Sequence, residues 1–323
     1  MPPDGLIDMT TPPLVTVVMP CYNAAKTVEM AIESARGQSH RPIEILCIDD
    51  GSKDDTLAIL KRLEGDDLTV IVCDKNGGVA AARNRGIAAA KGAYIAFLDS
   101  DDSWASDKVA RQLAMIDADP AMVMAGCRAE VLRIDGAREL VNANREPPQG
   151  PEAWRSMLHH SYLVPSVVMV RTAVARRIGG FNEAMRSAEE DQDFFIRLAL
   201  EGKAGFVDAV LTTMHEQPSS LSSRNRLREY ETVLPMVLRH CRKLADRLST
   251  AERRAIVGAR HTAIGRGVYL GMPLLGMRLL ARAIVNGDEP MTNLYYMLTA
   301  SPWARWLKAK LRHPASADTL ART

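Results

Sequence analysis

The sequence predicts an α/β protein with a mostly parallel sheet flanked by helices, followed by a helical C-terminal region. Short apolar runs rich in β-branched residues alternate with segments of helical periodicity through the first hundred residues. That alternation is typical of parallel strands joined by crossover helices. Polar residues follow three of the runs, at 20–23, 49–52 and 99–102. Ligands of such sheets bind beyond the carboxyl ends of the strands, so we expect a binding site where these segments meet.

The elements expected in the first hundred residues begin or end at recognisable signals. Pro20 stops the first apolar run, because proline has no amide hydrogen to donate to a sheet, and Thr27 is a candidate N-cap. Gly51 marks a turn after the second run. The expected strands are Leu14–Met19, Ile43–Ile48, Leu68–Cys73 and Tyr94–Leu98, and the expected helices are Thr27–Arg36, Asp54–Leu63 and an Ala-rich segment that follows Asn76-Gly-Gly and ends near Ala90.

The later elements are predicted from weaker patterns. Alternation of apolar and polar residues favours an antiparallel strand between Pro120 and Ile134. A cluster of acids opens a helix that ends at Leu200, and His215 is expected in the loop after the last strand. The further expected elements are a short helix at Trp154–His159, strands at Val164–Val170 and Gly205–Ala209, and successive helices from about residue 226 that are separated by Pro273, Gly287 and Pro302.

Length and charge favour two parts. With 323 residues, 47% of them hydrophobic, the chain is long enough for one large domain or two ordinary ones. Residues 1–223 carry 23 Lys and Arg against 32 Asp and Glu, whereas the remainder carries 18 against 7. An acidic body with a basic tail predicts two parts with different surroundings. We place one domain at residues 1–222 and a basic helical region at 223–323.

The cysteines and the N-terminal residues favour a cytoplasmic location. The five cysteines are scattered and form no closely spaced pair of the kind that binds metal, so we expect buried thiols in a reducing compartment. Met1–Pro13 is proline-rich and lacks the apolar core of a signal peptide. No window reaches the roughly 18 uninterrupted apolar residues that a membrane span requires.

The segment Tyr94–Trp104 places acids at the end of a buried strand. Asp99, Asp101 and Asp102 follow the apolar run directly, and buried carboxylates are costly unless a cation or hydrogen bonds compensate them. Asp99 and Asp101 point to the same side of an extended segment. Such oxygens suit Mn²⁺ or Mg²⁺, which keep further positions for phosphate oxygens. The alternative is a solvated turn with an Asp N-cap, and the cluster alone does not decide between the two.

Four short motifs follow one another along the first part of the chain, at the ends of the expected strands and at the start of the Ala-rich helix. They are Val17-Val-Met-Pro-Cys-Tyr-Asn23, Ile48-Asp-Asp-Gly-Ser52, Asn76-Gly-Gly-Val-Ala-Ala-Ala-Arg-Asn84 with Gly86, and Leu98-Asp-Ser-Asp-Asp102. In this order they resemble the inverting glycosyltransferases of family 2, which have a GT-A fold with a Rossmann-type sheet. A fifth motif, Gly179-Gly-Phe-Asn182 followed by Glu190-Asp191, lies at the distance expected for that family. The resemblance covers residues 14–222; each motif is weak alone, whereas the ordered set is specific.

The resemblance implies a nucleotide-sugar site around the first two motifs. Pro20, Tyr22 and Asn23 would line the nucleobase. Asp50 would accept a hydrogen bond from the ring N–H of a uracil, which a fixed carboxylate is suited to do. The alternative for Asp50 is a cap on the turn at Gly51.

The resemblance also implies a metal and diphosphate site around the later motifs. Asp101 would bind Mn²⁺ or Mg²⁺, with His215 as a further candidate ligand, and Asp99 and Ser100 would contact the donor. Arg83 would donate to a phosphate or to the Asp99 carboxylate, and a position on the surface of its helix is the alternative. The metal would neutralise a diphosphate leaving group.

Asp191 matches the general base of the family. It would take the proton of the acceptor hydroxyl as that oxygen attacks the anomeric carbon, and a single displacement of this kind inverts the anomeric centre. Glu190 would support it, because a neighbouring acid raises the pKa of a carboxyl group; the alternative for Glu190 is a favourable place in the first turn of a helix. Trp104 is a candidate for the acceptor side, with the core as its alternative.

We therefore expect a metal-dependent inverting glycosyltransferase that moves a hexosyl or N-acetylhexosaminyl group from a UDP-linked donor to a hydroxyl of a saccharide or lipid-linked saccharide, in polysaccharide or glycolipid assembly. Two alternatives stay open: a sugar-1-phosphate nucleotidyltransferase, which would need a Gly-rich basic loop after the first strand, and a non-catalytic nucleotide-sugar-binding scaffold. The absence of G-x-G-x-x-G and G-x-x-x-x-G-K-[ST] disfavours dinucleotide oxidoreductases and P-loop phosphotransferases. No nucleic-acid partner is expected.

Residues 301–312 form the sharpest pattern of the C-terminal region. Trp303, Trp306 and Leu307 share one face of a predicted helix, with basic residues around them. Tryptophan with basic residues on an amphipathic helix suits an anionic membrane surface, whereas a helix packed on the body is the alternative. Peripheral contact with the inner face of the cell membrane is therefore a hypothesis from the sequence.

Overall fold

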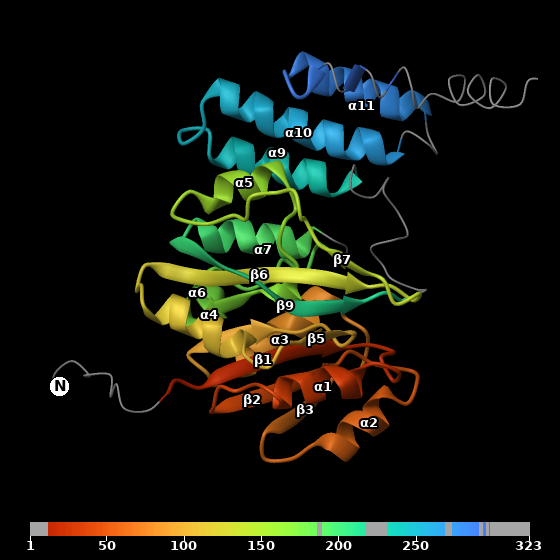
Figure 1. Ribbon diagram of the computed structural model, residues 1–323, viewed down its shortest axis with the longest axis vertical. Helices are drawn as coiled ribbons and strands as arrows, with labels where there is room; N and C mark the ends of the chain where they lie inside the picture. Colours follow the sequence, from red (N-terminus) through yellow and green to blue (C-terminus); the bar gives the residue numbers. More distant parts are fainter. Residues whose placement is uncertain are drawn as a thin grey trace, which may run out of the picture. The chain divides into compact units, whose positions relative to one another are not determined.

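The chain divides into two compact units, and the first contains the sheet. The computed structural model describes residues 12–185, 189–217, 231–268, 273–290, 293–294 and 297, and Figure 1 shows the ribbon. The units are Met1–Met157 with Ser161–Ser220, and Leu158–His160 with Leu221–Thr323. The strands are β1 (Val15–Cys21), β2 (Ile43–Asp49), β3 (Leu68–Val72), β4 (Tyr94–Phe97), β5 (Asp102–Trp104), β6 (Met122–Leu132), β7 (Arg138–Leu140), β8 (Met169–Arg171) and β9 (Lys203–His215).

The strand order of the sheet is β3-β2-β1-β4-β8-β6-β9-β5, with β7 beside β6. β1 runs parallel to β2 and β4, and β2 runs parallel to β3. β8 is antiparallel to both β4 and β6, whereas β6 and β9 are parallel with shifts of register. The expected α/β fold with a mostly parallel sheet is confirmed, and the antiparallel pairs enter only after β4.

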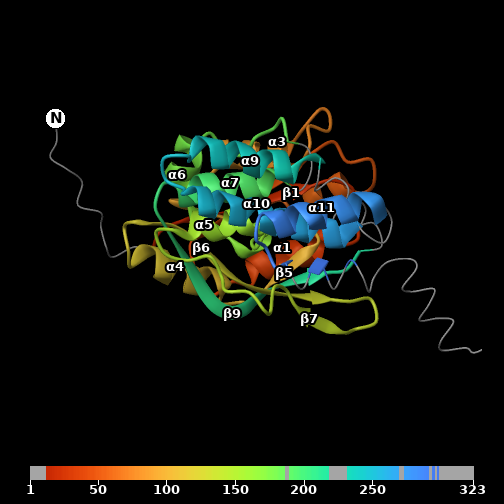
Figure 2. The same cartoon turned by 90° about the horizontal axis from the view of Figure 1, so that it is seen from above.

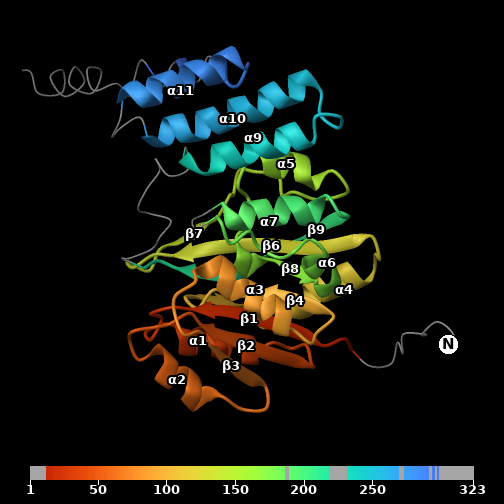
Figure 3. The same cartoon turned by 180° about the vertical axis from the view of Figure 1, so that it is seen from behind.

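Helices cover both faces of the parallel strands, because alternate side chains of β1 and β2 point to opposite sides. Val17 and Ile45 pack in a core with α1, α2 and α4, whereas Val18 and Ile48 lie under Gly86 of α3. Seen from behind in Figure 3, α3 and α6 lie on the same side of β4 and β8. The helices of this unit are α1 (Val28–Arg36), α2 (Thr56–Leu63), α3 (Val79–Ala89), α4 (Lys108–Asp117), α5 (Ala153–His159), α6 (Thr172–Arg177) and α7 (Glu190–Ala199).

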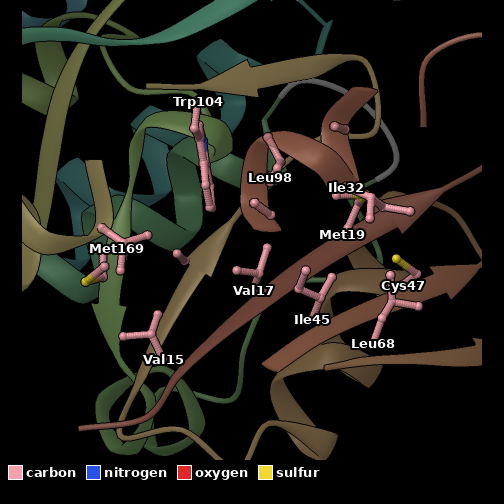
Figure 4. Close-up of a cluster of buried hydrophobic side chains, with 14 of the residues drawn as sticks. Val15, Val17, Met19, Ile32, Ile45, Cys47, Leu68, Leu98, Trp104 and Met169 are labelled. Carbon is pink, nitrogen blue, oxygen red and sulfur yellow. The ribbon is translucent and has the colours of Figure 1, made fainter. Parts of the chain in front are cut away.

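The core between the parallel strands and α1 is built from fully buried aliphatic side chains. Figure 4 shows Val17, Met19 and Ile45 beside Ile32 of α1. Burying a side chain of this size contributes roughly 1.5–3 kcal/mol. This core fixes the parallel strands in register and thereby fixes the loops that leave their carboxyl ends.

Two sequence expectations are wrong in detail. Val164–Val170 is not one strand, because Pro165–Val167 forms a single 3-10 turn, η1, and only Met169–Arg171 pairs as β8. Proline suits the first turn of a helix and cannot donate to a sheet ladder. The last strand is longer than expected, so His215 lies at the end of β9 and not in a loop. The short strand β5, formed by Asp102–Trp104, was not expected.

The second unit is helical. Its described helices are α9 (Val233–Lys243), α10 (Thr250–Val268) and α11 (Pro273–Val285), which lie side by side in Figure 1 and Figure 2. Gly265 lets α10 approach α11 closely, since an added Cβ would lie 3.0 Å from Leu280 Cγ. Residues 301–312 lie outside the described part of the chain. Among the helices that are described, none has both the length and the hydropathy to cross a membrane.

Candidate functional site

The loops after β1 and β2 are joined by side-chain hydrogen bonds. The amide of Asn23 donates to Ser52 Oγ at 3.1 Å, and the amide of Lys53 donates to Asn23 Oδ1 at 2.8 Å. Asn23 has a φ of 51°, in the left-handed region that asparagine tolerates. Pro20 is buried at the end of β1, whereas Tyr22 is 45% exposed. Asn23 therefore shapes the loop, and the Tyr22 ring is open to a ligand.

Asp50 holds the turn that precedes α3. Its buried carboxylate accepts hydrogen bonds from the amide of Gly77 at 2.9 Å and from the amide of Gly78 at 2.8 Å. Arg85 Nη1 lies 3.6 Å from Asp50 Oδ1. Each carboxylate oxygen has a second lone pair, so these contacts leave room for one more donor. Arg85, which sequence reasoning missed, is signalled only by being the second arginine of Arg83-Asn84-Arg85.

Arg83 joins the acidic end of β4 to the start of α7. Its Nη2 lies 2.7 Å from Asp99 Oδ1, and its Nη1 lies 3.5 Å from Glu190 Oε1. The Arg83 side chain is only 5% exposed, so the surface alternative for this residue is wrong. Burial alone would lower the pKa of Arg83, but the carboxylates of Asp99 and Glu190 raise it above the ordinary arginine value. Arg83 therefore stays charged in the interior.

The acids after β4 are crowded: Asp102 is buried, and Asp99 and Asp101 are partly buried. Burial, together with the charge of Asp99, raises the pKa of Asp101 to about 6. Burial and the charges of Asp99 and Asp101 also raise the pKa of Asp102 well above its usual value. Ser100 is partly buried between them. Repulsion of this kind is what a cation would relieve, so these residues fit a divalent metal.

A metal ion bound here would take only some of its coordinating atoms from the protein. Within the described ranges, no group of three or more His, Cys, Asp or Glu side chains is arranged around one point. His215 Nε2 lies 2.9 Å from Ser103 Oγ, which places the imidazole beside the acidic strand end. Burial lowers the pKa of His215, and the charge of Arg138 adds to that effect. His215 is thus a neutral imidazole near neutral pH.

Asp191 lies in the first turn of α7 and is partly buried. Its Oδ1 accepts a hydrogen bond from the amide of Gln192 at 2.6 Å. Burial and the charge of the neighbouring Glu190 raise the pKa of Asp191, Arg83 offsets part of the shift, and the resulting pKa is about 8. Burial likewise raises the pKa of Glu190, against the opposing effect of Arg83. A carboxyl group with a pKa near neutrality is suited to exchanging a proton with a substrate.

An aromatic cluster fixes α7 against α3. Phe181 stacks on Phe194 of α7 with ring centres 4.0 Å apart, and meets Phe97 of β4 edge-on at 5.4 Å. Asn84 of α3 donates to the Phe181 carbonyl at 2.9 Å and accepts from the Phe181 amide at 2.7 Å. A Cβ on Gly180, whose φ is 67°, would lie 2.3 Å from Asn84 Oδ1. The Gly179-Gly-Phe-Asn182 motif therefore connects the helix of Arg83 to the helix of Asp191.

The two tryptophans of the sheet unit are buried. Trp104 is 7% exposed, and its Nε1 donates to the Ser166 carbonyl at 2.8 Å. Trp154 is fully buried. Trp104 therefore packs inside the protein next to the acidic strand end. Neither tryptophan ring has a face that is free to contact a sugar.

Comparison with known proteins gives a consistent result. The family model described as "Glycosyl transferase family 2" matches residues 16–179. The succinoglycan biosynthesis protein ExoO of Rhizobium meliloti is 28% identical over 318 residues, covering 94% of this chain and 90% of ExoO. TarS of S. aureus, solved with UDP-GlcNAc, superposes with a TM-score of 0.65 at 20% identity, over 93% of this chain and 92% of that one.

A second solved structure extends the likeness of fold. The mannosyltransferase PcManGT of Pyrobaculum calidifontis, solved with GDP-Man and Mn²⁺, superposes with a TM-score of 0.60 at 19% identity, over 94% of this chain and 85% of that one. At these identities the structural likenesses show the fold alone. The family model, in contrast, spans half of the chain and contains the loops after β1, β2 and β4 together with α3. The chain belongs to glycosyl transferase family 2.

Proposed function

We propose that the sheet unit, to about residue 222, transfers a hexosyl or N-acetylhexosaminyl group from a UDP-linked donor to a hydroxyl of a saccharide or lipid-linked saccharide, with inversion, in polysaccharide or glycolipid assembly. The observation that carries the proposal is the buried bridge of Arg83 between Asp99 and Glu190. It brings the acids expected to face the diphosphate next to the helix that carries the expected base. The names of ExoO and of the TarS complex support the substrate class.

Asp191 is the proposed general base. Its partly exposed carboxylate stands at the N-terminus of α7, where an acceptor hydroxyl would approach from the solvent side. The raised pKa of Asp191 makes its carboxylate a stronger base than an exposed aspartate. Arg83 limits that rise, so a useful fraction stays ionised near neutral pH. Glu190 is the proposed supporting acid, because its charge raises the pKa of Asp191 and its Oε1 faces Arg83.

Asp101, with Asp99 and His215 beside it, is proposed to hold Mn²⁺ or Mg²⁺. When bound, the ion neutralises the negative charge that develops on a departing diphosphate. The raised pKa of Asp101 supports the assignment, because a nearby cation would favour its ionised form. PcManGT, which has a similar fold, is solved with GDP-Man and Mn²⁺.

The loops after β1 and β2 are proposed to bind the nucleoside. Tyr22 offers an exposed ring for stacking on a base, and Asp50 offers a lone pair to the N–H of uracil. Asn23 holds the loop in place through its two hydrogen bonds to the loop after β2, and Pro20 is buried next to it in β1. Arg85, 45% exposed and close to Asp50, is positioned to contact the same ligand.

Membrane contact by residues 301–312 and a location at the inner face of the cell membrane stay predictions from the sequence alone. The segment lies outside the described residues. Its composition is the only support for that part of the proposal.

Replacing Asp191 by Asn tests the base. We expect UDP release from a panel of UDP-sugars with a saccharide acceptor to fall by about 10²–10⁴-fold, the usual contribution of a general base, while UDP binding measured by calorimetry stays unchanged. Gln192→Glu is not a control, because Gln192 contacts the base; Asp208→Asn, an exposed acid on β9, is a suitable one. A wild-type protein that binds UDP-sugars without releasing UDP would favour the scaffold alternative, and full activity of Asp191→Asn would exclude Asp191 as the base.

The pH dependence of the reaction follows from the pKa of Asp191, about 8. Below that pH most of the Asp191 carboxyl groups are protonated, and a protonated carboxyl group cannot accept the proton of the acceptor hydroxyl. We therefore expect kcat/KM to fall by about tenfold for each pH unit below 8 and to level off above it. UDP affinity, measured at the same pH values, separates loss of the base from loss of donor binding. A profile that is flat between about pH 6 and 9 would contradict this role.

Replacing Arg83 by Met tests the bridge. The change leaves Asp99 and Glu190 without their shared cation, and breaking a buried pair in this way costs about 3–5 kcal/mol of unfolding free energy. Arg85→Met, two residues along the same helix and 45% exposed, is the matched control. Asp50 keeps its hydrogen bonds from the amides of Gly77 and Gly78 in this variant, so we expect a loss of only about 1 kcal/mol. Urea denaturation measures both. Equal stability of the two variants would show that the Arg83 bridge is unimportant.

Replacing Asp101 by Ala tests the metal site. A ligand at about 100 times its Kd adds about 2.7 kcal/mol to the stability of the folded state, so UDP with Mn²⁺ should raise the melting temperature of the wild type. We expect Asp101→Ala to lose the part of the increase that depends on Mn²⁺. Asp107→Ala, whose half-exposed carboxylate pairs with Arg111, should keep it. A full Mn²⁺-dependent shift in Asp101→Ala would remove Asp101 from the site.

A further inference from the structure

Lys108 is a buried cation that lies over the ring of Trp104, next to the acidic segment of the proposed donor site. It is the first residue of α4 and is fully buried. Among the ion pairs of the described residues it has no carboxylate partner; its Nζ donates to Gln112 Oε1 at 2.8 Å and lies 4.0 Å from the centre of the Trp104 ring. Burial lowers the pKa of Lys108 to about 8. A buried ammonium is costly, so these two contacts take the place of a counter-ion.

Both partners of Lys108 make a second contact, and both contacts end on the turn η1. Trp104 donates from Nε1 to the carbonyl of Ser166 at 2.8 Å. Gln112 donates from Nε2 to the carbonyl of Val167 at 2.8 Å and to the carbonyl of Ala125 at 2.9 Å. Lys108 favours the same orientation of the Gln112 amide as these two carbonyls do, because its ammonium can bond only to the amide oxygen.

The turn η1 in turn holds the acidic strand end. Ser166 Oγ accepts a hydrogen bond from the amide of Asp99 at 3.0 Å and also hydrogen-bonds the carboxyl group of Asp102. The Ser166 carbonyl receives a further bond from Thr212 Oγ1 at 3.1 Å. One hydroxyl therefore contacts both ends of the segment that carries Asp99, Asp101 and Asp102.

We propose that Lys108 is a positioning residue for the donor site: with Trp104 and Gln112 it fixes η1, and η1 sets the place of the acids after β4. Lys108 itself touches none of these acids and acts through two neutral side chains. The proposal rests on the proposed function only in identifying this strand end as the place where the donor diphosphate binds. Figure 4 shows Leu98 and Trp104, the residues that flank this acidic segment, as members of the same hydrophobic cluster.

Hydrogen exchange of the intact protein tests the positioning without any substrate. In Lys108→Met, the Gln112 oxygen loses its donor and the Trp104 ring loses its cation. We expect exchange in residues 98–104 to become faster by about tenfold or more, while exchange in β2 and β3 keeps the wild-type rate, because local opening leaves the rest of the fold closed. Arg111→Met, an exposed residue of the same helix, is the matched control and should match the wild type in both segments.

A second variant guards against a folding failure of Lys108→Met. Trp104→Phe keeps an aromatic ring under the ammonium but removes the N–H that reaches the Ser166 carbonyl. We expect the same local increase in exchange, smaller than in Lys108→Met because the Gln112 arm remains. UDP affinity in the presence of Mn²⁺, measured by calorimetry, should fall by about tenfold in Lys108→Met.

Two results would overturn the proposal. One is exchange in residues 98–104 within about twofold of the wild type in both folded variants. The other is an equal increase in β2 and β3, which would show that Lys108 only contributes to global stability. If the wild-type protein binds no UDP, the proposed function fails, whereas the exchange measurement still decides whether Lys108 positions the strand end.

Discussion

The buried guanidinium of Arg83 is the interaction on which the candidate site depends. It lies between two carboxylates from distant parts of the chain, Asp99 and Glu190, at 2.7 and 3.5 Å. Removing three charges from water is costly, and their mutual attraction offsets that cost only when the geometry is good. An arrangement of this kind is weak evidence for stability. It is better understood as a constraint that places two acidic segments at a fixed separation.

The acids around Arg83 outnumber it, and the pKa values record the imbalance. Asp101 and Asp102 on one side, and Glu190 and Asp191 on the other, all have raised pKa values, with burial as the largest cause. The ionised forms of these acids are therefore disfavoured, and a bound cation would favour them again. The proposed metal site and the proposed general base both depend on this excess of buried acids over arginine.

Much of this arrangement was predictable from the sequence, and the reason is local. The β-branched runs and the Gly turns specify β1 to β4 and their helices, because the signals lie within a few residues of what they control. Pro20 was expected to stop the first strand, but it lies within β1, which continues to Cys21. The 3-10 turn has a local signal, Pro165, which the apolar run around it obscures. Burial of Arg83 against Glu190 and the pairing of β5 with β9 depend on contacts between residues more than a hundred positions apart. Lys108 was missed for the same reason, since a lysine after Asp107 resembles any exposed residue of a helix.

Gly86 allows α3 to pack directly against the sheet, and this close packing affects the position of Arg83. An atom added at its Cα would lie 2.3 Å from Val18 Cγ1 of the sheet, so the helix rests directly on β1. The guanidinium three residues earlier can reach Asp99 because no side chain lifts the helix from the strands. A residue without a side chain thus determines how far one of the longest side chains reaches, so a substitution at Gly86 would displace the guanidinium of Arg83 from Asp99 although Gly86 is not itself one of the candidate site residues.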